Sequence, residues 1–226
     1  MATPLRQVRE RELVSATRAL FDERGMQEAP IEEIARAVGI ARGLVYRHFS
    51  SKEELFVLTV TEYLSELGDL LEEAVAEERL PRAQLERLTE AFARYCLRYP
   101  AFLDCAFALM RRPARETREG VSESVWLRLG QGMGRPIGCL SRVLAAGADE
   151  GSFAVADPDY TANVLWTQGL GIMHLARIGI GLRQYGGSDL PELFSVSPEN
   201  VVGSCVYSAL ALAGADDPAA AVPSAG

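Results

Sequence analysis

Lysine, histidine and cysteine are scarce in this chain of 226 residues. It contains a single lysine, Lys52, together with two histidines and four cysteines. The cysteines are widely spaced and form no C-x-x-C pair, which argues against a metal site and against a disulfide framework. We interpret them as small core residues: Cys96, Cys105, Cys139 and Cys205.

Long hydrophobic runs are also missing. No apolar stretch reaches the roughly 18 residues that indicate a transmembrane helix, and the N-terminus MATPLRQVRERE is charged, unlike a signal peptide. We therefore expect a cytoplasmic protein with no membrane partner.

Catalytic patterns are equally scarce. The two histidines, His48 and His174, lie far apart in the sequence. No Ser-His-Asp or Cys-His set, phosphate-binding loop or dinucleotide fingerprint is apparent. The sequence therefore predicts a protein that is not an enzyme and that carries no cofactor and no metal.

Charge is distributed unevenly along the chain. The net charge is −8 overall, so the whole chain is not a basic nucleic-acid binder. Residues 1–52, however, hold nine basic and seven acidic residues, whereas residues 53–226 hold 14 basic and 24 acidic residues. This asymmetry favours contact with polyanions only at the N-terminal end.

The hydrophobic spacing predicts an all-α fold with about nine helices and no convincing strand. Prolines and glycines mark most of the boundaries, and Pro136 with nearby glycines should kink the seventh helix or make it irregular. We expect a polar loop at 111–118 and another loop at 184–198. The expected helices cover 4–24, 31–38, 41–49, 50–79, 81–99, 100–110, 121–148, 157–178 and 198–213.

Residues 31–49 follow the plan of a helix-turn-helix, with Gly39 in the turn. In this plan the second helix enters the major groove of DNA. Val45 and Phe49 share one side of that helix and should face the domain core. The opposite surface then consists of Arg42, Gly43, Leu44, Tyr46 and Arg47. Arginine can bind guanine or phosphate, and glycine permits close approach.

The segment IEEIARAVGIARGLVYRHFSSKEEL, with TRALFDERG before it, closely resembles the N-terminal domain of TetR-family transcriptional regulators. The resemblance covers about residues 10–56. It implies a homodimer that binds a palindromic, double-stranded operator and releases it on binding a small molecule. It also implies a DNA-binding domain at 1–52 and a helical ligand-binding and dimerisation domain at 53–214. The composition of residues 215–226, rich in alanine, proline and glycine, predicts a flexible tail.

The resemblance assigns DNA contacts to Arg42, Gly43, Leu44, Tyr46, His48 and Lys52, and the outward face adds Arg47. Leu44 stands where the family usually has a threonine, and could instead touch a thymine methyl. Two alternatives stay open. The arginines and Tyr46 could be ordinary surface residues, and His48 could bridge helices inside the domain instead of binding phosphate.

Aromatic and methionine residues in the predicted domain at 53–214 indicate a mostly apolar ligand pocket with a few polar groups. The expected ligand is small and hydrophobic or amphipathic. At helical spacing the same residues could simply form the core, and His174 could be a core histidine. The predicted pocket residues are Tyr63, Tyr95, Phe102, Phe107, Met110, Trp126, Met133, Trp166, Gln168, Met173 and His174.

Small and apolar residues on the last two long helices predict the dimer interface, in which two helices from each subunit form a four-helix bundle. A monomer that buries these faces internally is the alternative. The predicted interface residues are Ala162, Leu165, Gly169, Ile172, Leu175, Val202, Cys205, Val206 and Ala209. The favoured function is a repressor; an activator, a helical binding module without DNA recognition, or an enzyme are the other hypotheses.

Overall fold

The structure of this chain is a computed structural model that describes residues 4–25, 30–184 and 191–215. Its contacts group the chain into two compact units. Unit 1 comprises Met1–Glu66 with Tyr99–Arg135, and unit 2 comprises Leu67–Arg98 with Pro136–Gly226. The two long helices α4 (Lys52–Ala76) and α8 (Glu123–Asp149) contribute residues to both units.

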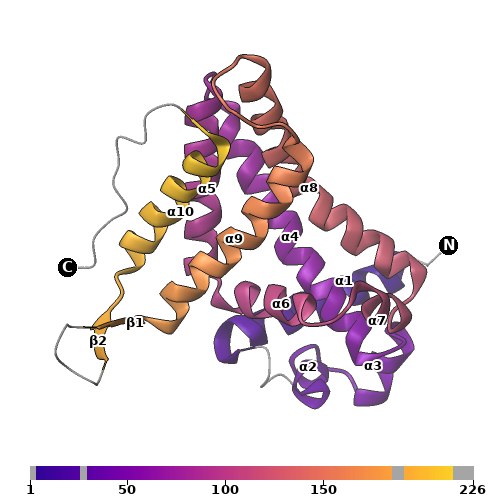
Figure 1. Cartoon of the computed structure of the whole chain (residues 1–226). Coiled ribbons are helices and arrows are strands. Elements are labelled where there is room, and N and C mark those ends of the chain that lie inside the picture. The colour runs from indigo at the N-terminus through magenta and orange to yellow at the C-terminus, as the bar shows by residue number, and fades with distance from the viewer. Residues whose placement is uncertain (1–3, 26–29, 185–190, 216–226) are drawn as a thin grey trace. The chain divides into compact units, whose positions relative to one another are not determined.

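Unit 1 contains the three N-terminal helices, which pack against one another (Figure 1). It also contains α6, which contacts both α1 and α7, and the first parts of α4 and α8. Its own helices are α1 (Pro4–Arg24), α2 (Ile31–Ala37), α3 (Arg42–His48), α6 (Pro100–Met110) and α7 (Ala114–Glu119).

Unit 2 is built on the helices α5, α9 and α10, which contact one another. The helix α10 packs along both α5 and α9. A salt bridge between Arg94 and Glu199 joins α5 and α10 at the surface. The elements are α5 (Pro81–Arg98), α9 (Pro158–Ile178), β1 (Ile180–Arg183), β2 (Glu192–Ser195) and α10 (Pro198–Ala213), with the last part of α4 and of α8.

The all-α prediction is confirmed, because the described residues form ten helices and one two-stranded sheet. Prolines begin helices where the sequence placed them. Pro100, Pro158 and Pro198 each occupy the first turn, where a missing N–H leaves no hydrogen bond unmade. At α9 the Asp157 carboxylate also accepts a hydrogen bond from the backbone N–H of Tyr160, at 2.9 Å.

Two local predictions are wrong. The expected polar loop at 111–118 contains α7, in which the N–H groups of Glu116 and Thr117 bond to the carbonyl of Pro113 and the Thr117 side chain is buried. The expected absence of strands also fails, because β1 and β2 form an antiparallel pair that places Leu182 opposite Leu193 and Gly181 opposite Phe194.

Gly181 of β1 and Phe194 of β2 lie opposite each other in this hairpin. The spacing of residues within each short strand does not indicate this pairing. A Cβ on Gly181 would lie 2.3 Å from the ring of Phe194, so only glycine leaves room for that ring across the strand pair. The Arg183 guanidinium also lies over the Phe194 ring, 4.8 Å from its centroid. Part of the predicted 184–198 loop, residues 185–190, and the predicted tail beyond Ala215 lie outside the described residues.

The helix α4 begins with a capping box, as its S-x-x-E sequence indicates. The hydroxyl of Ser51 accepts a hydrogen bond from the backbone N–H of Glu54 at 3.0 Å. The Glu54 carboxylate in turn accepts one from the backbone N–H of Ser50 at 2.6 Å and one from the hydroxyl of Ser122. This buried carboxylate therefore ties the start of α4 to the segment before α8.

The helix α8 continues through Pro136, which lies in its interior. None of the helices among residues 4–25, 30–184 and 191–215 is both long and apolar enough to cross a bilayer.

Candidate DNA-binding surface and ligand cavity

The position of α3 follows from two buried side chains, Val45 within the helix and Phe49 directly after its last residue. Val45 and Phe49 are 1% and 2% exposed, and the helix packs against α1 and α2, where Ile34 and Phe21 are also buried. Burying an aliphatic or aromatic side chain of this size stabilises a fold by about 1.5–3 kcal/mol. These two anchors therefore fix which side of α3 faces outwards.

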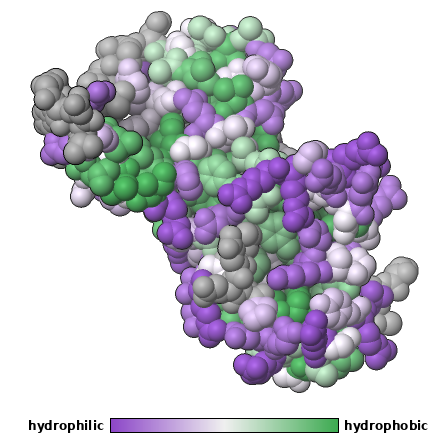
Figure 2. Space-filling model, turned by 60° about the horizontal axis from the view of Figure 1, so that its bottom comes forward, coloured by the Kyte–Doolittle hydropathy of each residue, from purple (hydrophilic) through white to green (hydrophobic). Residues whose placement is uncertain are grey.

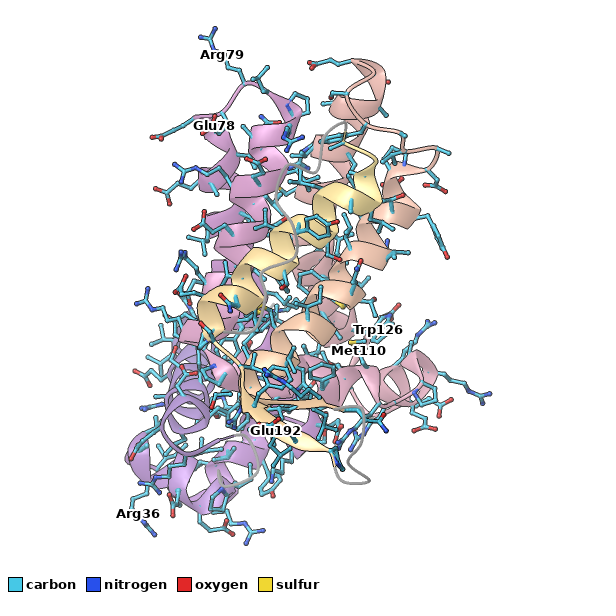
Figure 3. The ribbon with its side chains drawn as sticks, turned by 60° about the vertical axis from the view of Figure 1, so that its left-hand side comes forward. Arg36, Glu78, Arg79, Met110, Trp126 and Glu192 are labelled. Atoms are coloured by element: carbon cyan, nitrogen blue, oxygen red, sulfur yellow. The ribbon has the colours of Figure 1, made fainter. Side chains whose placement is uncertain are left out.

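The turn before α3 is held by the backbone. Gly39 adopts a left-handed conformation with φ of 69°, a region that glycine enters without steric cost. The N–H of Gly39 bonds to the carbonyl of Arg36 at 3.0 Å, and the N–H of Ile40 bonds to that of Ala35 at 2.9 Å. Figure 3 shows the Arg36 side chain pointing away from the chain at this turn. This turn sets the angle between α2 and α3.

The outward side of α3 is exposed as the sequence predicted. Arg42, Gly43 and Arg47 are exposed, as are Leu44 at 38% and Tyr46 at 45%. Figure 2 shows hydrophobic patches among hydrophilic side chains on the face it displays, and Leu44 is one of the large hydrophobic residues that remain exposed. A short helix with two arginines, a tyrosine and a leucine facing solvent has the side chains that read DNA bases and phosphates.

Gly43 has no structural reason to be glycine. Its φ is outside the left-handed region, and a Cβ built at this position would meet nothing within 4 Å. A glycine in a helix costs about 0.5–1 kcal/mol relative to alanine. The space above Gly43 is therefore open to a ligand that approaches the backbone.

Arg42 is engaged within the chain. Its Nη1 atom lies 2.5 Å from Oε1 of Glu32 on α2, and its guanidinium lies 5.9 Å from the ring centroid of Tyr46. The side chain of Tyr46, and then the charge of Glu32, raise the pKa of Arg42. Glu32 thus competes with any anion that approaches Arg42, a contact that sequence reasoning missed.

His48 and Lys52 border this surface differently. The Nδ1 atom of His48 is buried and has no hydrogen-bond partner in the part of the chain that the structure describes. Only Nε2 of His48 is then available for a phosphate contact. Lys52 is exposed at the start of α4, and no described carboxylate forms an ion pair with it.

Unit 2 contains a small apolar cavity between α5, α9 and α10. The volume open to the centre of a water molecule is about 30 Å³. Phe92 and Trp166 form one wall, with ring centroids 5.5 Å apart. The polar side chains of the wall are Thr89, Gln168 and Ser208, and the Gln168 amide donates a hydrogen bond to the hydroxyl of Ser208. A few water-sized spheres fill the cavity, so a larger molecule would have to move side chains.

The predicted pocket residues are divided between the two units. Trp166 and Gln168 line the cavity of unit 2. Tyr95 and Met173 are buried in unit 2 outside its lining, and His174 is exposed on α9. His174 is therefore not a core histidine. The remaining six belong to unit 1: Tyr63, Phe102, Phe107, Met110, Trp126 and Met133, of which Met110 and Trp126 are labelled in Figure 3.

Tyr63 forms part of the core of unit 1. Its side chain is fully buried, and its hydroxyl donates a hydrogen bond to Oδ1 of Asp22 at 2.6 Å. The Arg18 guanidinium lies 4.3 Å from the centre of its ring, and Phe102 packs on it at 5.9 Å. Burial, and then the hydrogen bond to Asp22, raise the pKa of Tyr63. This hydroxyl is therefore already bonded within unit 1.

The predicted interface residues lie mainly inside unit 2. Leu165, Gly169, Ile172, Cys205 and Ala209 line its cavity. Ala162 and Val202 are also buried in the single chain, whereas Val206 is half-buried and Leu175 is 41% exposed. A side chain buried within one chain has little surface left for a second copy, so the predicted contact can use mainly Ile172, Leu175 and Val206.

Gly169 has a clear structural role. A Cβ at this position would lie 2.9 Å from Cε1 of Phe92, so the glycine lets α5 approach α9 closely. The four cysteines are all buried and free, and burial raises the pKa of Cys96, Cys105 and Cys205. Among the described residues, no group of three or more His, Cys, Asp or Glu residues could hold a metal ion.

Comparison with known proteins relates the three N-terminal helices α1–α3, called the head below, to a family. Residues 13–58 match the family model "Bacterial regulatory proteins, tetR family". The chain is 32% identical over 85 residues to HTH-type transcriptional regulator BetI 2 of Chromohalobacter salexigens, covering 37% of this chain and 41% of that protein. The N-terminal part of the chain therefore matches the TetR family. It is also 38% identical over 80 residues to HTH-type transcriptional repressor KstR2 of Rhodococcus jostii, covering 35% of this chain and 39% of that protein.

The matched region spans about two fifths of the length of these relatives. Similarity of fold extends further. The crystal structure of RolR in complex with the ligand resorcinol superposes with a TM-score of 0.66 at 16% identity, covering 98% of each chain. Sequence likeness is therefore concentrated at the head, and the body shares a fold.

Proposed function

We propose that this chain is a sequence-specific DNA-binding transcriptional regulator, and that it is a repressor released from its operator by a small, largely hydrophobic ligand. The observation that carries the proposal is the outward face of α3. Val45 and Phe49 anchor the helix, and Arg42, Tyr46 and Arg47 face solvent around the open Gly43. The match of residues 13–58 to the TetR family model supports the same assignment.

In this mechanism α3 enters the major groove and α2 lies across the backbone. Arg42 and Arg47 can each donate paired hydrogen bonds to guanine or to phosphate. The hydroxyl of Tyr46 and the ammonium of Lys52 bind phosphate oxygens. Leu44 packs on a thymine methyl. Arg42 must leave Glu32 before it binds DNA, so the free head holds this arginine in a competing ion pair.

Two DNA-binding heads are needed to bind the two half-sites of an operator. A helix-turn-helix dimer binds half-sites one helical turn apart, which is about 34–36 Å. We propose that a homodimer provides this separation. The half-buried and exposed residues of α9 and α10, Ile172, Leu175 and Val206, are the interface positions that keep surface for a second copy.

The proposed effector site is the cavity of unit 2. Its walls are mostly apolar, and the Gln168–Ser208 pair offers one place for a ligand hydroxyl or carbonyl. RolR, whose fold is similar, has been crystallised with resorcinol. We infer a ligand of that general kind, with one polar group and a ring that packs against Phe92 and Trp166 once side chains move to enlarge the cavity. Release requires the ligand to bind the non-DNA-binding conformation more tightly.

The experiment begins with selection of an operator from genomic fragments by the purified protein. Affinity for that duplex is then compared between the wild type, Arg42→Ala and Tyr46→Ala, with Arg87→Ala as a control, since Arg87 is an exposed arginine of α5 in unit 2. We expect the two α3 variants to bind at least about tenfold more weakly while melting at the wild-type temperature. Wild-type affinity in both variants would reject the proposed surface.

A reporter gene placed behind the selected operator tests the direction of regulation. Higher expression when the regulator gene is deleted supports a repressor, and lower expression rejects it in favour of an activator.

A further inference from the structure

Unit 1 contains a second and larger cavity. Residues of α1 and α2, of the start of α4, of the end of α6 and of α7 line it. The volume open to the centre of a water molecule is about 310 Å³. Pockets that bind small molecules begin at about 300 Å³. It shares no lining residue with the unit 2 cavity, so it is a separate place for a ligand.

The inner wall of this cavity is apolar. Phe21, Ile34 and Leu55 line it and are themselves almost fully buried in unit 1. Leu109 at the end of α6 lines the other side. Such a wall favours a hydrocarbon or aromatic group, because apolar surface leaves water when the two meet.

The rim of the cavity is charged, and its charges do not cancel. Lys52, Glu53 and Arg112 line it. Arg112 forms an ion pair with Glu53, which leaves Lys52 as a cation with no ion-pair partner among the described residues. The lining residues together therefore carry a net charge of about +1, and an anion can bind there without displacing a carboxylate.

We propose that this cavity binds a small amphipathic carboxylate, whose apolar part lies on Phe21, Ile34 and Leu55 and whose anionic group pairs with Lys52. An apolar wall beside a single unpaired cation matches one tail and one negative charge. A cationic ligand would face Lys52 without compensation, and a neutral one would leave its charge unused.

This site reaches the DNA-binding surface through Lys52. That consequence depends on the proposed function, in which Lys52 binds an operator phosphate. A carboxylate on Lys52 neutralises that cation, and each lost phosphate contact weakens DNA binding and reduces its salt dependence. Bound carboxylate should therefore lower operator affinity directly at the head, independently of a ligand in unit 2.

Isothermal titration of the full chain with octanoate, in the absence of DNA, tests the binding itself. We expect one octanoate per chain, and no comparable heat from octylamine, which has the same tail and the opposite charge. Lys52→Met should weaken octanoate binding by about tenfold or more, because the ion pair is lost and the side chain keeps its length. Ala108→Met, which adds a side chain at the lining of the cavity, should also abolish binding.

Ala209→Met is the matched control, because it makes the same alanine-to-methionine enlargement in the lining of the unit 2 cavity. It should leave octanoate binding within about twofold of wild type. Binding that survives both Lys52→Met and Ala108→Met, that disappears in Ala209→Met, or that is equally tight for octylamine would overturn the proposal, as would an absence of octanoate binding. Thermal melts confirm that each variant is folded. Operator binding by the wild type without octanoate tests the proposed function separately.

Discussion

Replacing Arg47 by alanine should change how DNA binding depends on salt. Arg47 is exposed on α3 and forms no ion pair among the residues that the structure describes. Each head presents three exposed cations towards the proposed DNA surface, Arg42, Arg47 and Lys52, so a dimer presents about six. Each neutralised phosphate contributes about −0.9 to the slope of log affinity against log salt concentration. The wild-type slope should therefore be about −5.4.

The Arg47→Ala dimer loses two of these contacts, and its slope should be about −3.6. Between 50 and 200 mM salt, wild-type affinity should fall by about 2,000-fold and that of the variant by about 150-fold. Fluorescence anisotropy with a labelled operator duplex over that range measures both slopes. Arg87→Ala in unit 2 should keep the wild-type slope. A slope for Arg47→Ala equal to that of the wild type would show that this face of α3 does not meet the phosphates.

Three further results are expected. Glu32→Gln should strengthen operator binding at low salt, measured by anisotropy, because Arg42 no longer has a competing carboxylate at 2.5 Å; weaker binding would contradict this. Tyr63→Phe should lower the free energy of unfolding by about 1–2 kcal/mol in urea, because the buried hydroxyl bonds to Asp22, and an unchanged midpoint would argue against that bond. The pKa of Glu54 is lowered from 4.5 by hydrogen bonds that outweigh its burial, so its ionised form stabilises the fold above about pH 4.5 and this contribution is lost as the pH falls through the lowered value. Melting curves should accordingly show wild type losing stability relative to Glu54→Gln below pH 4.5, and parallel pH profiles would refute the assignment.

Local chemistry made much of the fold predictable. Proline is compatible with the first turn of a helix and incompatible with its interior, so Pro81, Pro100, Pro158 and Pro198 mark the starts of four helices correctly. The spacing of Val45 and Phe49 likewise gave the buried side of α3, because residues four apart share a helix face. These predictions needed only neighbouring residues.

Features that depend on distant residues could not be predicted. Thr117 is buried in α7 although its segment is mostly charged, and Phe194 pairs with Gly181 across a hairpin. Arg42 meets Glu32 from another helix. The small residues of α9, such as Gly169, look like an interface in the sequence, yet Gly169 accommodates the ring of Phe92 within unit 2. In each case the partner is set by packing, which periodicity does not specify.

The unit 1 cavity was hidden for the same reason. Its apolar wall uses residues that the sequence marks as ordinary core positions, such as Phe21 and Leu55. The cavity exists because α6 and α7 meet α1 and α2 around the start of α4. The spacing of residues along one helix does not predict a cavity formed among five helices.

Gly43→Ala tests the central claim most directly, because the chain itself has room for the added methyl group, with nothing within 4 Å. Alanine favours a helix over glycine by about 0.5–1 kcal/mol, so thermal melting should show a variant at least as stable as wild type. If α3 presents its backbone closely to the major groove, anisotropy should nevertheless show weaker operator binding by the same variant. A stable Gly43→Ala protein that binds the operator as tightly as wild type would contradict the account.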